Sequence, residues 1–185
     1  MLYNKNINLK NTMENTKKVA AAAATIISES EKKRLSQEKE SLSSDKKRLS
    51  LHFVLREFTL SGTAIRNRID NTPTAVEVER LRALCVNVLE PLRRRFGVLR
   101  ITSGYRSERL NSLVGGAKNS QHRLGEAADI HVSSREVAQK MCDYVRNNLD
   151  FDQLILESSK KMGVQWLHVS YKARGNRKEF FTIKK

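Results

Sequence analysis

The stretch SGYRSERLNSLVGGAKNSQHRLGEAADIH, residues 103–131, holds most of the candidate chemistry of this chain. Within it, His122 precedes Asp129 by seven residues, with Gly125 between them. The alanine, isoleucine and valine residues around Asp129 indicate a short strand. An imidazole and a carboxylate on either side of a glycine turn can converge on one cation. Zinc binds both kinds of ligand, and its catalytic sites commonly have three protein ligands, so a third ligand is expected elsewhere.

Two other histidines compete for the place of third ligand. His131 is two residues beyond Asp129, so in a strand both side chains would project from the same face. His168 lies in QWLHVSY, residues 165–171, a separate strand-like segment. The spacing alone does not choose between His131 and His168.

Three motifs in a fixed order resemble the zinc D-alanyl-D-alanine carboxypeptidase family. They are Ser-Gly-Tyr-Arg at residues 103–106, Ser-x-His-(six residues)-Asp at residues 120–129, and Trp-x-His at residues 166–168. The similarity covers roughly residues 51–172. The segment FTLSGTAIRNRIDNTP, residues 58–73, resembles the entry segment of phage and prophage members.

The resemblance implies a metal site and its location in the fold. Carried over residue by residue, the zinc ligands are His122, Asp129 and His168, which leaves His131 as a neighbour. The implied cofactor is Zn²⁺, held on the sheet. The implied partner is the stem peptide of peptidoglycan.

Four further residues receive roles in substrate binding or catalysis. Arg106, the arginine of Ser-Gly-Tyr-Arg, is expected to bind the terminal carboxylate of the substrate or to stabilise an oxyanion, because its planar fork suits both tasks. The alternative is a turn arginine paired with Glu108. Ser120 matches a serine that contacts substrate in the resembled family, and it could equally cap the loop. Tyr105 and Trp166 are expected to shape the pocket.

The chain departs from the resembled family at the general base. Many members carry a glutamate three residues before the last histidine ligand, and others carry a histidine five residues before it. Here these positions are Gln165 and Gly163, and neither can serve. Glu157 is the preferred base, with Glu126 and Asp152 as substitutes.

The choice of Glu157 depends on the register of a predicted hairpin. If the loop is residues 158–163, Gln153 lies opposite His168 and Glu157 shares that face, since strand residues alternate. A loop one residue longer or shorter would turn Glu157 away. The competing interpretation is an ordinary surface carboxylate.

Composition limits the class of protein. Of the 185 residues, 39% are apolar and 30% charged, and no stretch is long and apolar enough for a membrane-spanning helix. The net charge of +15 suits a polyanion such as a bacterial wall, but aromatic residues are not interleaved with the basic ones as in nucleic-acid-binding motifs. We expect a monomer that does not bind nucleic acid. Cys85 and Cys142 lie in apolar helical patterns, which favours buried free thiols over a disulfide.

Residues 1–50 differ from the rest of the chain. They are polar and charged without a sustained apolar stripe, and we expect a disordered or helical arm. Residues 19–27, VAAAAATII, follow two lysines but make a weak secretory signal. Met13 could be the true start. Action at the bacterial wall would then require export, or release from the cytoplasm by a lysis system.

Residues 51–185 are expected to form one α+β domain, a small and mainly antiparallel sheet covered by helices. Thr72 and Pro73 are expected to open a helix that Pro91 kinks and Gly97 ends. Ser133, with a glutamate three residues later, is expected to cap a second long helix. A hairpin and a final strand, EFFTI, would complete the sheet.

The function predicted from these features is a zinc peptidase that cleaves the bond after D-alanine in peptidoglycan, as a D,D-carboxypeptidase or an endopeptidase, in phage or prophage lysis. One alternative is a zinc-containing binding module with little or no activity, because Hedgehog signalling domains resemble this pattern and Gln165 replaces the usual glutamate. The other is a structural phage component that assembles through residues 14–50.

Overall fold

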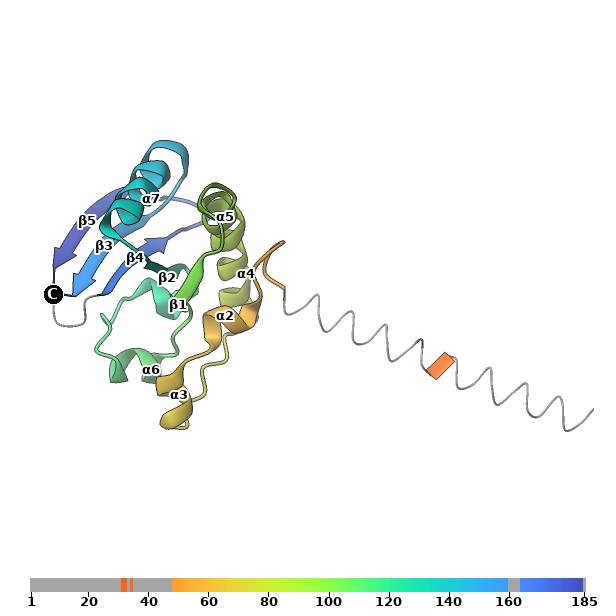
Figure 1. The fold of residues 1–185 in the computed structure, drawn as a ribbon. Helices are drawn as coiled ribbons and strands as arrows, with labels where there is room; N and C mark the ends of the chain where they lie inside the picture. The colour runs from red at the N-terminus through yellow and green to blue at the C-terminus, as the bar shows by residue number, and fades with distance from the viewer. Residues whose placement is uncertain (1–30, 33, 35–47, 160–163, 185) are drawn as a thin grey trace, which may run out of the picture. The chain divides into compact units, whose positions relative to one another are not determined.

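The computed structural model describes residues 31–32, 34, 48–159 and 164–184 (Figure 1). The chain divides into residues 1–46 and residues 47–185, and every helix and strand named below belongs to the second unit. Most of the predicted arm, including residues 19–27, lies outside the described residues. Among the described residues, none of the helices combines the length and the apolar character that a membrane span needs.

A five-stranded sheet in the order β1-β2-β4-β3-β5 forms the centre of the domain. The strands are β1 (Arg100–Ser103), β2 (Ala127–Val132), β3 (Gln153–Ser159), β4 (Val164–Ser170) and β5 (Glu179–Lys184). All neighbouring strands are antiparallel except β3 and β5, which run parallel. The predicted α+β class with a mainly antiparallel sheet is confirmed.

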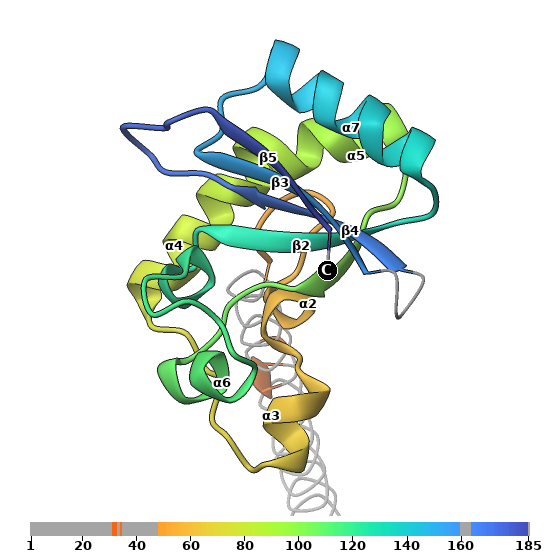
Figure 2. The ribbon, with the colours of Figure 1, turned by 90° about the vertical axis from the view of Figure 1, so that its left-hand side faces the viewer.

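Helices lie on both sides of this sheet. They are α2 (Leu55–Thr59), α3 (Gly62–Arg66), α4 (Ala75–Leu84), the π-helical turn η1 (Cys85–Leu89), α5 (Glu90–Phe96), α6 (Glu108–Leu113), the 3₁₀ turn η2 (Gln121–Leu124) and α7 (Arg135–Asn148). The long helices α4, α5 and α7 lie over one face, whereas the short α3 and α6 lie on the other side (Figure 2).

The first long helix begins two residues later than predicted. Its N-cap is Thr74, because Glu77 stands three residues further on and completes a capping box with it. Thr72 instead bonds the carboxylate of Asp70. At Pro91 we expected a kink, and the structure has the π-helical turn η1 just before this residue. Proline has no backbone N–H to donate, and a π-helical turn accommodates that missing hydrogen bond.

Of two other predicted helix ends, the C-terminal end of α5 is confirmed and the N-cap of α7 is one residue off. Gly97 ends α5 with a φ of 84°, a backbone conformation that favours glycine, as predicted. The cap of α7 is Ser134 and not Ser133, since the hydroxyl of Ser134 accepts from the N–H of Val137. Glu136 pairs with Lys140 and takes no part in a capping box.

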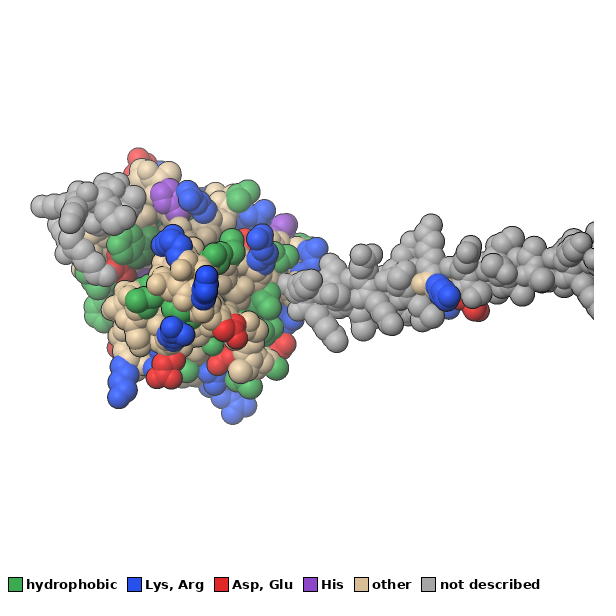
Figure 3. Space-filling model, turned by 90° about the horizontal axis from the view of Figure 1, so that it is seen from below, with side chains coloured by type: hydrophobic (Ala, Val, Ile, Leu, Met, Phe, Trp, Pro, Cys, Tyr) green, Lys and Arg blue, Asp and Glu red, His purple; other side chains and the backbone are tan. Residues whose placement is uncertain are grey.

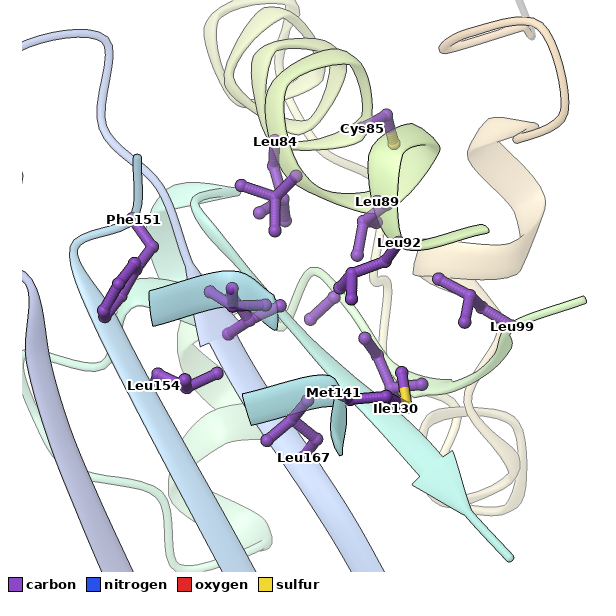
Figure 4. Close-up of a cluster of buried hydrophobic side chains, with 14 of the residues drawn as sticks. Leu84, Cys85, Leu89, Leu92, Leu99, Ile130, Met141, Phe151, Leu154 and Leu167 are labelled. Carbon is purple, nitrogen blue, oxygen red and sulfur yellow. The ribbon is translucent and has the colours of Figure 1, made fainter. Parts of the chain in front are cut away.

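The hydrophobic core fills the space between the sheet and the long helices (Figure 4). Alternate residues of β2, β3 and β4, such as Ile130, Leu154 and Leu167, point into it. Cys85 and Cys142 are free and buried there, and burial raises the pKa of the Cys142 thiol to about 12. The core also includes Leu49, which precedes the predicted boundary of the domain.

The register of the β3–β4 hairpin differs from the prediction by two residues. Ile155, and not Gln153, lies opposite His168, and Ser159 pairs with Val164 around a shorter loop. A shift of two residues keeps every side chain on its predicted face, because the side-chain period of a strand is two. Glu157 therefore shares the face of His168, as expected.

A buried carboxylate joins β3 to the segment that precedes β5. Asp152 is fully buried, and its two oxygens lie 2.6 Å from Arg177 Nη2 and 2.8 Å from Lys172 Nζ. Burial acts to raise the pKa of Asp152, but hydrogen bonds from Arg177 and Lys172 outweigh it and hold the pKa well below its usual range. Folding thus favours the ionised form of Asp152.

We predict that Asp152→Asn lowers the free energy of unfolding at neutral pH by about 1.5–3 kcal/mol, the usual contribution of hydrogen bonds to a charged group. The depressed pKa makes this contribution complete above the unfolded pKa of about 3.9, and the contribution is lost as the pH falls through the folded value. Urea denaturation between about pH 7 and pH 2 should show the gap between wild type and variant closing at low pH.

Asp143→Asn is the matched control for this prediction, because Asp143 makes an exposed ion pair with Arg146. Its effect should stay within about 0.5 kcal/mol. A gap between wild type and Asp152→Asn that does not change with pH would contradict the assignment.

Candidate metal centre and cleft

Three polar side chains meet on the face of the sheet that points away from the core. His122 comes from the 3₁₀ turn η2, while Asp129 and His168 are directly opposite each other on β2 and β4. All three side chains are buried, and each offers one ligand atom within 4.8 Å of the others. They are the only group of this kind among the residues that the structure describes.

The three donor atoms form a small triangle. Asp129 Oδ1 lies 3.2 Å from His122 Nε2 and 2.9 Å from His168 Nδ1, and the two nitrogens are 3.2 Å apart. Tetrahedral ligands at zinc distances of about 2.0–2.1 Å are about 3.3 Å from one another. The spacing of the donors therefore fits a single metal ion of this size.

The hydrogen bond to Gly104 determines which nitrogen of His122 carries the proton. His122 Nδ1 lies 2.6 Å from the carbonyl oxygen of Gly104, which can only accept, so Nδ1 donates and Nε2 presents its lone pair to the site. Burial lowers the pKa of His122 against the attraction of Asp129, which keeps the ring neutral. A lone pair of nitrogen thus faces the Asp129 carboxylate, and one cation would satisfy both donors.

Arg106 compensates the charge of the Asp129 carboxylate from the other side. Its Nη2 donates to Asp129 Oδ2 at 2.7 Å, and its Nε donates to Ser103 Oγ at 2.8 Å. Although burial acts to raise the pKa of Asp129, its close interactions with His122 and His168 outweigh burial and hold this pKa below the usual range. The predicted alternative, a pair between Arg106 and Glu108, is wrong, because Glu108 pairs with Arg123.

Two glycines allow the backbone to bring these side chains together. A Cβ on Gly104 would lie 2.6 Å from the Cα of Phe58, so only glycine lets the end of β1 approach α2 this closely. Gly125 ends η2 with a φ of 71°, and a Cβ there would lie 2.5 Å from the carbonyl oxygen of Glu77. Both positions fix the segment that carries His122.

The donor triangle lies in a cleft of about 1200 Å³. One wall is the sheet face, and the others include α3 and the loop of residues 114–120. Four arginines, Arg66, Arg100, Arg106 and Arg177, line the cleft, whereas Asp129 and Glu157 are the carboxylates that line it among the described residues. The cleft therefore favours an anionic ligand of considerable length.

The predicted bases occupy three different environments. Glu157 lines the cleft on β3 and is diagonal to His168 on β4, an arrangement in which Cα atoms are about 7–8 Å apart. Glu126 lies outside this lining, beside Arg80. Asp152 is fully buried in its pair with Arg177 and also lies outside it. Of the three carboxylates, the structure brings only Glu157 to the cleft.

The residues predicted to contact substrate all line the same cleft. Ser120 precedes η2, makes no side-chain cap bond and lines the cleft. Tyr105 is buried, and Trp166 is half-buried beside the site. His131 is exposed in the cleft and stands outside the donor group. Gln165 lies opposite Val132 and also lines the cleft.

A family model described as Peptidase M15 matches residues 51–170, well over half of the chain. This chain belongs to the peptidase M15 family. The family consists of metal-dependent peptidases, and a cluster of two histidines and one aspartate is a suitable site for such a metal. No curated protein matches this M15 peptidase at a significant level.

Two parts of the site were not predicted from the sequence of this M15 peptidase. One is the support given to His122 by the Gly104 carbonyl, and the other is the contact of Arg106 with Asp129. Every residue has a backbone carbonyl, so the sequence does not show which carbonyl accepts a given hydrogen bond. The Arg106 contact could have been anticipated, because a buried carboxylate needs a compensating charge.

We predict that Asp129→Ala and His168→Ala each weaken Zn²⁺ binding by more than about 100-fold, since even the partners of metal ligands contribute 10–100-fold. Competition against a chromogenic chelator would measure the affinity. His131→Ala is the control and should bind as tightly as wild type. Loss of metal from His131→Ala, with retention by His168→Ala, would identify the other histidine as the third ligand.

Proposed function

We propose that this M15 peptidase is a zinc enzyme that hydrolyses the bond after a D-alanine in the stem peptide of peptidoglycan. The observation that carries the proposal is the convergence of His122, Asp129 and His168 at one point of a long cleft that also contains Glu157. When bound there, zinc would polarise a peptide carbonyl and lower the pKa of a water molecule towards about 7.

The side chains around the donors supply the remaining steps. Glu157, on the same face as His168, takes the proton of the attacking water and passes it to the nitrogen of the leaving amine. The carbon–nitrogen bond breaks as the new carbon–oxygen bond forms. Arg106 holds Asp129 in place through Oδ2, and its position at the cleft lets the guanidinium stabilise the developing oxyanion or a terminal carboxylate.

The size and charge of the cleft support a peptide longer than a dipeptide. Small-molecule sites commonly have about 300–1,000 Å³, and this cleft exceeds that range at about 1200 Å³. The net charge of +15 favours a substrate embedded in an anionic wall. Basic side chains are spread over the face seen in Figure 3 and do not form one compact patch. A role in lysis or local opening of the wall is part of the proposal.

The proposal is tested with purified, zinc-loaded protein and defined muropeptides, both pentapeptide monomers and cross-linked dimers. Mass spectrometry should show products that disappear when a chelator is present. Loss of one alanine identifies a carboxypeptidase, and splitting of dimers identifies an endopeptidase. A folded, zinc-loaded sample that gives no product would contradict the proposal and favour a binding module.

We predict that Glu157→Gln keeps its zinc but lowers kcat by about 100-fold or more, because general-base catalysis typically contributes 10²–10⁴-fold. The two measurements are the zinc content and the rate on the muropeptide that wild type cleaves. Glu79→Gln makes the same chemical change at an exposed position on α4 and should leave both values unchanged. A near-normal rate for Glu157→Gln would exclude it as the base.

A further inference from the structure

The register of the sheet places a second row of side chains across the floor of the cleft. Arg100 on β1 is opposite His131 on β2, which is opposite Trp166 on β4, which is opposite Glu157 on β3. Directly opposed residues share a face of the sheet, and all four of these side chains line the cleft. The row is therefore a continuous surface beside the donor triangle.

An irregularity in β1 brings Arg100 onto this face. The donor row contains Ser103, Asp129 and His168, and the register between β1 and β2 shifts between Ile101 and Ser103. Without that shift, strict alternation would turn Arg100 and Ser103 to opposite faces. With it, both residues face the cleft.

The two rows are separated by two residues along β2 and β4. A strand rises 3.2–3.4 Å per residue, so the separation is about 6.5–7 Å. An extended peptide has the same rise, and the second row therefore lies about two substrate residues from the donor triangle. A substrate group bound at the Arg100 end of this row, across the sheet from Glu157 on β3, lies away from the bond that is cut.

The charge of Arg100 is available to such a group. Arg100 is exposed and makes no ion pair with the residues that the structure describes. Two other arginines of the cleft have different roles, since Arg106 pairs with Asp129 beside the donor triangle and Arg177 pairs with Asp152. A guanidinium in a cleft binds a carboxylate through paired N–H donors.

The neighbours of Arg100 suit a carboxylate on an aliphatic chain. His131 is exposed next to Arg100 and offers a ring N–H. Trp166 is half-buried on the other side of His131 and offers an apolar surface for methylene groups. The row thus combines a cation, a hydrogen-bond donor and an aromatic ring in sequence across the strands.

We propose that Arg100, His131 and Trp166 form a subsite for a second carboxylate of the substrate, about two residues from the scissile bond. The inference rests on the proposed peptidase function and specifies its substrate class. Two groups of a stem peptide have this chemistry, the side-chain carboxylate of a diaminopimelate at the third position and the free α-carboxylate of the D-glutamate at the second. Peptides that lack the bound carboxylate are poorer substrates.

The test uses four synthetic pentapeptides, in which each of the two carboxylates is either free or amidated. For wild type, amidation of the bound carboxylate should lower kcat/KM by about 10–100-fold, the range expected for hydrogen bonds to a charged group. Arg100→Gln should lower kcat/KM by a similar factor on the free peptide, mainly through KM, and should not change it on the amidated one. The carboxylate whose amidation lowers kcat/KM is the one that the subsite binds.

Arg94→Gln is the matched control, because Arg94 is exposed on α5 and lies outside the cleft lining. Equal rates on all four peptides, or an equal loss on all four in Arg100→Gln, would overturn the subsite while leaving the peptidase function intact. If none of the peptides is cleaved, the carboxypeptidase activity is excluded, and calorimetric binding of the same four peptides to zinc-loaded protein then tests the subsite independently of cleavage. Equal affinities would overturn it.

Discussion

Burial of the Asp129 carboxylate is the constraint on which the site depends. A buried carboxylate is costly unless it is paired, and here the cost is offset on both oxygens. Oδ2 accepts from Arg106, whereas Oδ1 faces the two imidazoles. Because Arg106 occupies Oδ2, the orientation of Oδ1 is fixed before any metal arrives. The Gly104 carbonyl does the same for His122 by directing its Nε2 into the site.

Side chains alternate along each strand, so the residues that stabilise the core and the residues that line the cleft lie on opposite faces of the sheet. On β2, Ile130 points to the core between sheet and helices, while Asp129 and His131 point to the cleft. The same division holds on β4 for Leu167 and His168. The core can therefore hold the sheet rigid without contributing a reactive group, and the cleft face can carry charges that would be too costly inside the core.

The motifs predicted which residues meet, because His122, Asp129 and His168 lie at spacings that the family resemblance identifies. Strand alternation also predicted the face of Glu157, although the hairpin register was two residues off. What the sequence could not show was local geometry. One example is the register shift in β1 that turns Arg100 to the cleft, and another is the helix start at Thr74, where two possible caps compete. Such competition is decided by tertiary contacts and not by the pattern of residues.

The most direct test of this account is a zinc-edge anomalous diffraction measurement on crystals of the zinc-loaded protein. The account predicts one strong peak about 2.0–2.2 Å from each of three atoms, His122 Nε2, Asp129 Oδ1 and His168 Nδ1. The positions of Arg106 and the Gly104 carbonyl should not change. A peak coordinated by His131, or zinc bound elsewhere with the donor triangle unoccupied, would contradict it.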